Sequence, residues 1–167
     1  MEHKAWQDKG FEWKDDKLVK VNGVTSQFLA MTKTSFIKSG GYNENFPFAG
    51  FEDHDFGIRL MQAGISAYID TGTMILHDES DRIELDGWMQ RKYRGGQTRK
   101  VAVQMGHADL AINYNNVKGA VYFIISKFEF LFTRALKLIP NKKIFDPLYF
   151  RIVNILLGTN LYKGYTK

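Results

Sequence analysis

Residues 51–56 read Phe51-Glu52-Asp53-His54-Asp55-Phe56 and place three carboxylates within four positions. Apolar residues then recur at helical spacing up to Gly64, a residue type that commonly ends helices. The sequence therefore predicts a short helix whose first turn carries the acids. Carboxylates are favoured there because the first N–H groups of a helix lack partners and the helix dipole is positive at that end. Helix capping alone is thus a sufficient structural reason for Glu52 and Asp53.

The residues on either side of the acids extend this pattern. Ahead of them stands Gly40-Gly41-Tyr42-Asn43-Glu44, followed by a loop rich in aromatic and small residues that ends at Gly50. Behind them come Arg59-Leu60 and then Gly64. Loops carry function more often than the elements they connect, so the loop and the acids together form the candidate site.

The combined pattern resembles the acceptor-side motif of family 2 inverting glycosyltransferases and of the galactosyltransferase C-terminal region. Those proteins read GGFDE, a short aromatic and glycine-containing loop, EDxDL, RL and a Gly that ends the helix. In this chain Tyr42 and Asn43 replace the usual Phe and Asp, and Phe56 replaces the usual Leu. The resemblance covers about residues 20–105.

The resemblance implies an α/β fold, namely the C-terminal part of a GT-A (nucleotide-diphospho-sugar transferase) fold. We expect residues 1–110 to be the acceptor-side half of that GT-A domain and residues 111–167 to be an amphipathic helical tail. The donor side of such a fold consists of βαβ units that end in a D-x-D metal motif, and residues 1–50 do not contain that pattern. We therefore expect little or no activity from this chain alone.

Local patterns predict the neighbouring elements. Thr32 is expected to cap one helix, because its hydroxyl can accept an unpaired N–H group, and Gly40-Gly41 to end it. Gly95-Gly96 is expected to interrupt a later helix. One predicted strand begins near Leu18, and three others cover residues 24–31, 67–70 and 74–76. The predicted helices cover residues 33–39, 117–139 and 147–162.

The acids have a clear chemical use in sugar transfer. A sugar hydroxyl is a poor nucleophile at neutral pH, and a nearby carboxylate can accept its proton as the new bond forms. In the resembled families the second acid of the pair is that base, which corresponds to Asp53. Glu52 would then bind the acceptor, and Asp55 would support the helix start or pair with Arg59 four residues later.

The resemblance also places the preceding loop beside the acceptor sugar. It implies acceptor contacts from Phe48, Gly50 and Phe51. The alternative is a loop that is simply held in place by burial of its aromatic side chains. The sequence leaves both interpretations open.

Two further sets of residues point to the sugar donor. His77 follows an apolar segment, and the resemblance implies that it binds a divalent cation, Mn or Mg, that bridges the donor diphosphate. A basic run follows and can hold the anionic diphosphate. A solvated helix face is the other interpretation of that run. The predicted diphosphate-binding residues are Arg91, Lys92, Arg94 and Arg99.

Composition limits the class of protein. The chain has 167 residues, 44% of them hydrophobic, and no cysteine, which excludes disulfides and thiolate metal sites. No run approaches the roughly 20 apolar residues that a membrane-spanning helix needs. Residues 1–80 carry eight Lys or Arg and twelve Asp or Glu, whereas residues 117–167 carry nine and two. The apolar, basic tail is typical of a helix lying on an anionic membrane surface, or of one that docks on another part of the enzyme.

Taken together, the resemblance implies a metal-dependent glycosyltransferase of polysaccharide biosynthesis. It would transfer sugar from a nucleotide-diphosphate donor to a saccharide or lipid-linked acceptor with inversion, and nucleic acid is not an expected partner. We expect a cytoplasmic protein, or one peripheral on the inner face of the cell membrane. Two alternatives remain: a metal-dependent phosphohydrolase using His54, Asp55 and His77, and a membrane-surface binding module without catalysis.

Overall fold

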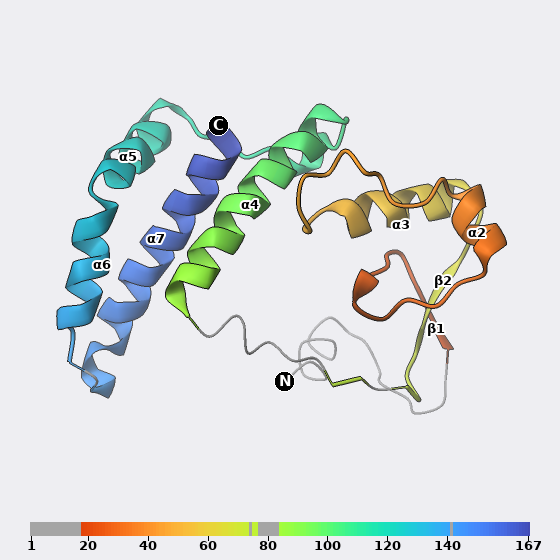
Figure 1. Ribbon diagram of the computed structural model, residues 1–167, viewed down its shortest axis with the longest axis horizontal. Coiled ribbons are helices and arrows are strands. Elements are labelled where there is room, and N and C mark those ends of the chain that lie inside the picture. The colour runs from red at the N-terminus through yellow and green to blue at the C-terminus, as the bar shows by residue number, and fades with distance from the viewer. Residues whose placement is uncertain (1–17, 74, 77–83, 141) are drawn as a thin grey trace. The chain divides into compact units, whose positions relative to one another are not determined.

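The computed structural model describes residues 18–73, 75–76, 84–140 and 142–167. The chain divides into two compact units. Unit 1 comprises residues 1–43 and 52–77, and unit 2 comprises residues 44–51 and 78–167. Figure 1 shows strands and short helices in unit 1 and long helices in unit 2.

Unit 1 is a small mixed α/β unit. The strands β1 (Leu18–Val21) and β2 (Ala67–Asp70) pair in antiparallel fashion, with Leu18 opposite Asp70 and Val21 opposite Ala67. Between them lie the 3-10 turn η1 (Ser26–Phe28) and the helices α2 (Lys33–Lys38) and α3 (Glu52–Gln62). The strand expected near Leu18, the strand over residues 67–70 and the helix that begins at the acids are confirmed.

The predicted strand over residues 24–31 is wrong, since this segment contains η1. Its hydroxyl side chains explain the difference. Thr25 Oγ1 accepts from the Gln27 N–H at 3.4 Å, and the Ser26 N–H donates to Asp53 Oδ2 at 3.0 Å. Side-chain acceptors thus take the backbone donors that a strand would need for its ladder. The predicted strand over residues 74–76 lies partly outside the described residues, and Ile75 and Leu76 are in no strand.

Helix α2 begins and ends as its sequence predicts. Thr32 Oγ1 accepts from the Ser35 N–H at 3.1 Å and so caps the first turn. At the other end Gly40 and Gly41 have φ values of +80° and +65°, a left-handed conformation that favours glycine. The Gly41 N–H donates to the Phe36 carbonyl at 3.0 Å, which closes the helix.

The core of unit 1 is aromatic. Phe56 on α3 is fully buried, and Leu60 one turn later is nearly so. The Phe56 ring lies 4.5 Å from the Tyr42 ring and 5.8 Å from the Phe36 ring, measured between centroids. The helical spacing that predicted a buried face on α3 is therefore confirmed, and the GGYNE segment packs on that face through Tyr42.

Unit 2 is helical in its described residues. Its elements are α4 (Leu85–Gln104), η3 (Ala108–Leu110), α5 (Asn116–Lys127), α6 (Glu129–Leu138), η4 (Lys143–Phe145) and α7 (Asp146–Thr166). Helix α7 packs against α4 on one side and against α5 and α6 on the other (Figure 1). Four tyrosine rings from α5, α7 and the segment before α5 form one cluster: Tyr114, Tyr122, Tyr162 and Tyr165.

The expected interruption at Gly95-Gly96 is wrong, because α4 continues through both glycines. The reason lies in packing against α7. A Cβ at Gly96 would come within 2.7 Å of the Tyr165 backbone nitrogen, and a Cβ at Gly164 would overlap the Tyr93 carbonyl. The two glycines let the backbones of α4 and α7 approach closely, and this contact outweighs the weak helix propensity of glycine.

The single helix predicted over residues 117–139 is also wrong. It is divided into α5 and α6 at Phe128, whose φ of −112° and ψ of 16° are not helical. The helix predicted over residues 147–162 is confirmed and is longer, since α7 begins with Asp146 and Pro147. No helix in the described part of the chain combines the length and apolar character needed to cross a membrane.

Candidate functional site

Asp53 lies in the first turn of α3 and has two differently placed carboxylate oxygens. Oδ2 accepts from the backbone N–H of Ser26 at 3.0 Å and from its hydroxyl at 3.1 Å. Oδ1 is buried, and no hydrogen-bond donor in the described residues reaches it. Buried carboxylate oxygens are normally satisfied, because leaving one without a donor costs free energy. The arrangement therefore holds the carboxylate through Oδ2, and Oδ1 is the buried oxygen without a donor.

Asp55, two residues later, forms an ion pair that stabilises the fold. The predicted pair with Arg59 is confirmed: Arg59 Nη2 and Nε donate to Asp55 Oδ2 at 2.7 Å and 2.9 Å. Arg59 Nη1 also donates to the carbonyls of Ser39 and Gly41, at 2.9 Å and 2.6 Å. The ion pair therefore fastens the end of α2 and its glycine turn to α3.

Glu52 and Asp53 share their surroundings with Tyr42. Burial raises the pKa of the Tyr42 hydroxyl, and the negative charges of Asp53 and Glu52 raise this pKa further. A phenol with a raised pKa stays protonated around neutral pH and can donate a hydrogen bond. Tyr42 is thus a neutral polar group beside the two acids in unit 1.

The loop residues predicted to bind acceptor belong to unit 2, where they lie against α4. The hydroxyl of Thr98, which is fully buried, donates to the Phe48 carbonyl at 3.2 Å, and Gly50 lies against the same side chain. The Arg94 guanidinium lies 5.1 Å from the centre of the Phe48 ring, and that of Arg99 lies 5.8 Å from the Phe51 ring. Cation–π contacts of this kind fix the loop on α4.

The predicted diphosphate-binding residues divide into two pairs. Arg94 and Arg99 contact the loop rings, and Arg99 Nε also donates to the Leu110 carbonyl at 2.5 Å. Arg91 and Lys92 are exposed on the first half of α4. All four therefore come from one helix of unit 2, whereas the acids come from unit 1.

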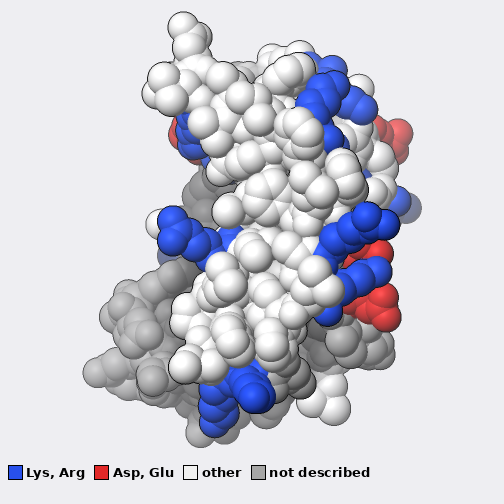
Figure 2. All heavy atoms as spheres, turned by 90° about the vertical axis from the view of Figure 1, so that its left-hand side faces the viewer, with Lys and Arg blue, Asp and Glu red and all other residues white. Residues whose placement is uncertain are grey.

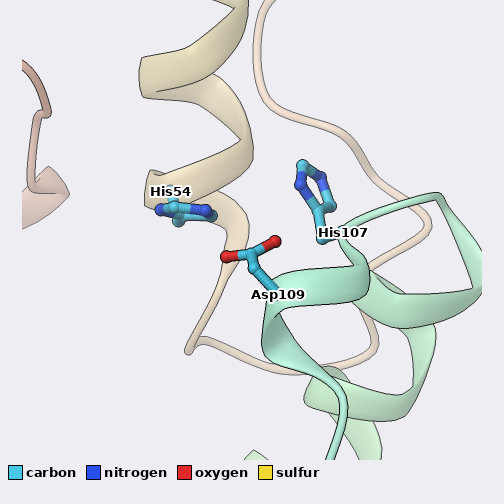
Figure 3. A group of neighbouring side chains, drawn as sticks. All are labelled: His54, His107 and Asp109. Atoms are coloured by element: carbon cyan, nitrogen blue, oxygen red, sulfur yellow. The ribbon is translucent and has the colours of Figure 1, made fainter.

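The metal ligand expected at His77 lies outside the described residues. Figure 3 shows three other residues with ligand atoms: His54 on α3, and His107 and Asp109 at η3. His54 belongs to unit 1 and the other two to unit 2, so the three do not define one metal site. The expected Mn or Mg therefore has no assigned ligands among the described residues.

A hollow of about 430 Å³ lies within unit 2, away from the predicted residues. Its lining comes from the start of α4, from α6 and from Tyr149 of α7. Acidic and basic side chains face it together, namely Glu84, Asp86 and Lys137. No predicted site residue lines it, so it does not change the assignment of the site.

Sequence reasoning missed two residues that organise the site. Ser26 holds the Asp53 carboxylate from 27 positions away, a separation that no local spacing rule detects. Thr98 holds the Phe48 carbonyl across 50 positions. A Ser or Thr on a predicted element is a common residue, so neither carries a recognisable signal in the sequence.

One comparison with known proteins found a match. Residues 19–78 match a family model described as the N-terminal domain of galactosyltransferase. This description differs from the C-terminal region named by the resemblance in the sequence, and it covers the motif around Asp53. Searches of curated proteins and of solved structures found no match. The match supports a relation between residues 19–78 and glycosyltransferase domains, and it covers less than half of the chain.

Proposed function

We propose that this chain is the acceptor-side part of a family 2, GT-A-type glycosyltransferase, and that it transfers sugar from a nucleotide-diphosphate donor to an acceptor hydroxyl. The family match over residues 19–78 supports the reaction class. The carboxylate of Asp53, held through one oxygen and without a donor on the other, is the observation that carries the proposal.

In the proposed reaction Asp53 is the general base. The acceptor hydroxyl gives its proton to Oδ1 while its oxygen attacks the anomeric carbon of the donor. The bond from that carbon to the diphosphate breaks, and the nucleoside diphosphate leaves with the electron pair. A single displacement of this kind inverts the anomeric centre. Ser26 keeps Oδ1 oriented by holding Oδ2, so it acts as a positioning residue.

Other residues have supporting roles in this proposal. Glu52 hydrogen-bonds the acceptor, and Phe48, Gly50 and Phe51 form the loop next to the acids in the chain. The exposed residues Arg91 and Lys92 are better placed to meet a diphosphate than Arg94 and Arg99, which contact the loop rings. A Mn or Mg ion held by His77 would neutralise the leaving diphosphate.

The test compares two aspartates that occupy equivalent places. Asp53 and Asp86 each lie in the first turn of a helix, but only Asp53 belongs to the matched domain. The protein, with any upstream part of its reading frame, is given nucleotide-sugar donors and saccharide or lipid-linked acceptors. Asp53→Asn should lower turnover by about 10²–10⁴-fold with donor affinity unchanged, whereas Asp86→Asn should leave turnover unchanged.

Two results would overturn the proposal. Turnover of Asp53→Asn within a few-fold of the unsubstituted protein would remove Asp53 as the base. Hydrolysis of a phosphoester at the same rate with and without acceptor sugar would favour the phosphohydrolase alternative. Product stereochemistry, read by proton NMR of the new glycosidic bond, checks inversion independently of either variant.

A further inference from the structure

Helices α5 and α6 carry an apolar stripe that faces away from the rest of unit 2. Its members recur at spacings of three or four residues on α5 and of seven on α6, Phe128 joins the two helices, and all are exposed. Val117 at one end and Leu138 at the other are 74% and 82% exposed. The stripe consists of Val117, Val121, Ile124, Phe128, Leu131 and Leu138.

The opposite side of α5 and α6 packs against the rest of unit 2. Leu136 of α6 is buried, and the Tyr122 ring of α5 stacks on the Tyr162 ring of α7 with centroids 5.8 Å apart. The fold of unit 2 therefore does not need the outward stripe. A contiguous apolar surface of this kind usually marks a place where a protein meets a partner or a membrane.

Basic residues accompany the stripe. Lys118, Lys127, Arg134 and Lys137 are all exposed on the same two helices. Figure 2 views the side of the molecule with α5 and α6 and shows a broad uncharged surface, with Lys and Arg around it and some Asp and Glu at its edges. Aliphatic and phenylalanine side chains bordered by Lys and Arg are typical of helices that lie in a membrane interface.

The acid on these helices does not offset that charge at the surface. Glu129 is the sole Asp or Glu of α5 and α6, and its carboxylate turns toward α7. There it accepts from Lys163 at 2.7 Å and from the Asn160 amide at 2.9 Å. The charge of Lys163 is thus neutralised within unit 2. Lys137 shares the hollow with Glu84 and Asp86, so the basic residues considered for the stripe are Lys118, Lys127 and Arg134.

We propose that the α5–α6 stripe inserts into the surface of an anionic lipid bilayer. A second copy of the same face would bring like charges together, whereas anionic headgroups complement them. The helices would lie in the plane of the interface, with the stripe about 5–10 Å into the headgroup and acyl boundary. This inference rests on unit 2 alone and does not require that the protein transfers sugar.

Vesicle co-sedimentation tests the proposal with the full chain. Vesicles of phosphatidylcholine alone are compared with vesicles containing about one third phosphatidylserine, at low and at high salt. We expect binding to the anionic vesicles only, weakened by salt. Lys127→Gln with Arg134→Gln should weaken it about fivefold per charge removed, whereas Lys33→Gln with Lys38→Gln on α2 should not.

The apolar part of the proposal has its own variants. Ile124→Glu with Leu131→Glu should reduce binding at least tenfold, and Ile37→Glu, at an equally exposed position on α2, should leave it unchanged. Far-ultraviolet circular dichroism confirms that each variant keeps its helices. Failure to bind anionic vesicles, equal loss in the control variants, or a stable dimer that dissociates in the stripe variant would each overturn the proposal.

Discussion

The two units of this chain differ in what their surfaces leave unused. Unit 1 is held by an aromatic core and by polar contacts, and among its described residues a buried carboxylate oxygen of Asp53 lacks a donor. Unit 2 is joined by close helix packing, and its unused surface is the apolar stripe of α5 and α6. An oxygen without a donor suits a hydroxyl, and an apolar stripe suits a lipid surface. The two proposals above assign one task to each unit, and the variants below test them separately.

The largest expected effect on stability tests the packing of unit 2. Gly96→Ala should destabilise the protein by about 2 kcal/mol, because the new methyl group would overlap the backbone of α7. Gly95→Ala is the matched control, since nothing lies within 4 Å of a Cβ there, and it should stabilise by about 1 kcal/mol through helix propensity. Urea denaturation followed by circular dichroism measures both.

Equal effects at the two glycines would contradict the close approach of α4 and α7. Close helix packing would then no longer distinguish unit 2 from unit 1. A large loss of unfolding free energy in Gly96→Ala alone would support that distinction.

The next effect tests the polar contacts of unit 1. Arg59→Met should cost about 2 kcal/mol, because it removes the partner of Asp55 and the donor to the carbonyls of Ser39 and Gly41. The partly exposed position of Arg59 limits the loss. Arg91→Met, on the exposed side of α4, should change the free energy of unfolding by less than about 0.5 kcal/mol. A similar free energy of unfolding for both variants would show that the contacts of Arg59 with Asp55, Ser39 and Gly41 do not stabilise unit 1.

A smaller effect concerns the orientation of Asp53. Ser26→Ala removes the hydroxyl donor to Oδ2 but keeps the Ser26 N–H donor. Turnover should fall by about tenfold, and KM for the donor should not change. Thr34→Ala, at an exposed position on α2, is the control. A rise in the KM for donor without loss of turnover would contradict a positioning role.

The smallest effect is a shift in the pKa of Tyr42. The folded protein holds this pKa above its ordinary value, so the associated stability is present below pH 10 and is lost as the pH rises through the raised pKa. Glu52→Gln with Asp53→Asn should lower the pKa, although burial should keep it raised. NMR titration with labelled tyrosine measures the change. An unchanged pKa would place the acids away from Tyr42.

The sequence predicted the elements whose cause is local. Thr32, the Gly40-Gly41 turn and the spacing of Phe56 and Leu60 each act within a few residues, and the structure has each as expected. The Asp55–Arg59 pair is also a neighbour effect and was predicted for the same reason.

Two of the wrong predictions, the break at Gly95-Gly96 and the strand over residues 24–31, share another cause, which is contact between distant residues. Gly96 counts against a helix by propensity, but Gly164, far along the chain, makes it the residue that fits. Residues 24–31 have strand-like composition, but Asp53 takes the Ser26 N–H. The candidate site shows the same division: the motif points to the acids, which stay a prediction, whereas the contacts of Ser26 and Thr98 were not expected, because each acts across more than 25 positions.

The most direct measurement varies the acidity of the acceptor hydroxyl. Turnover of the unsubstituted protein and of Asp53→Asn is compared over a series of acceptors whose hydroxyl groups range from weakly to more strongly acidic. If Oδ1 accepts the hydroxyl proton, the loss caused by Asp53→Asn should shrink steadily as the acceptor becomes more acidic, because less help is needed to remove the proton. An equal loss for every acceptor would assign Asp53 a structural role and contradict the account.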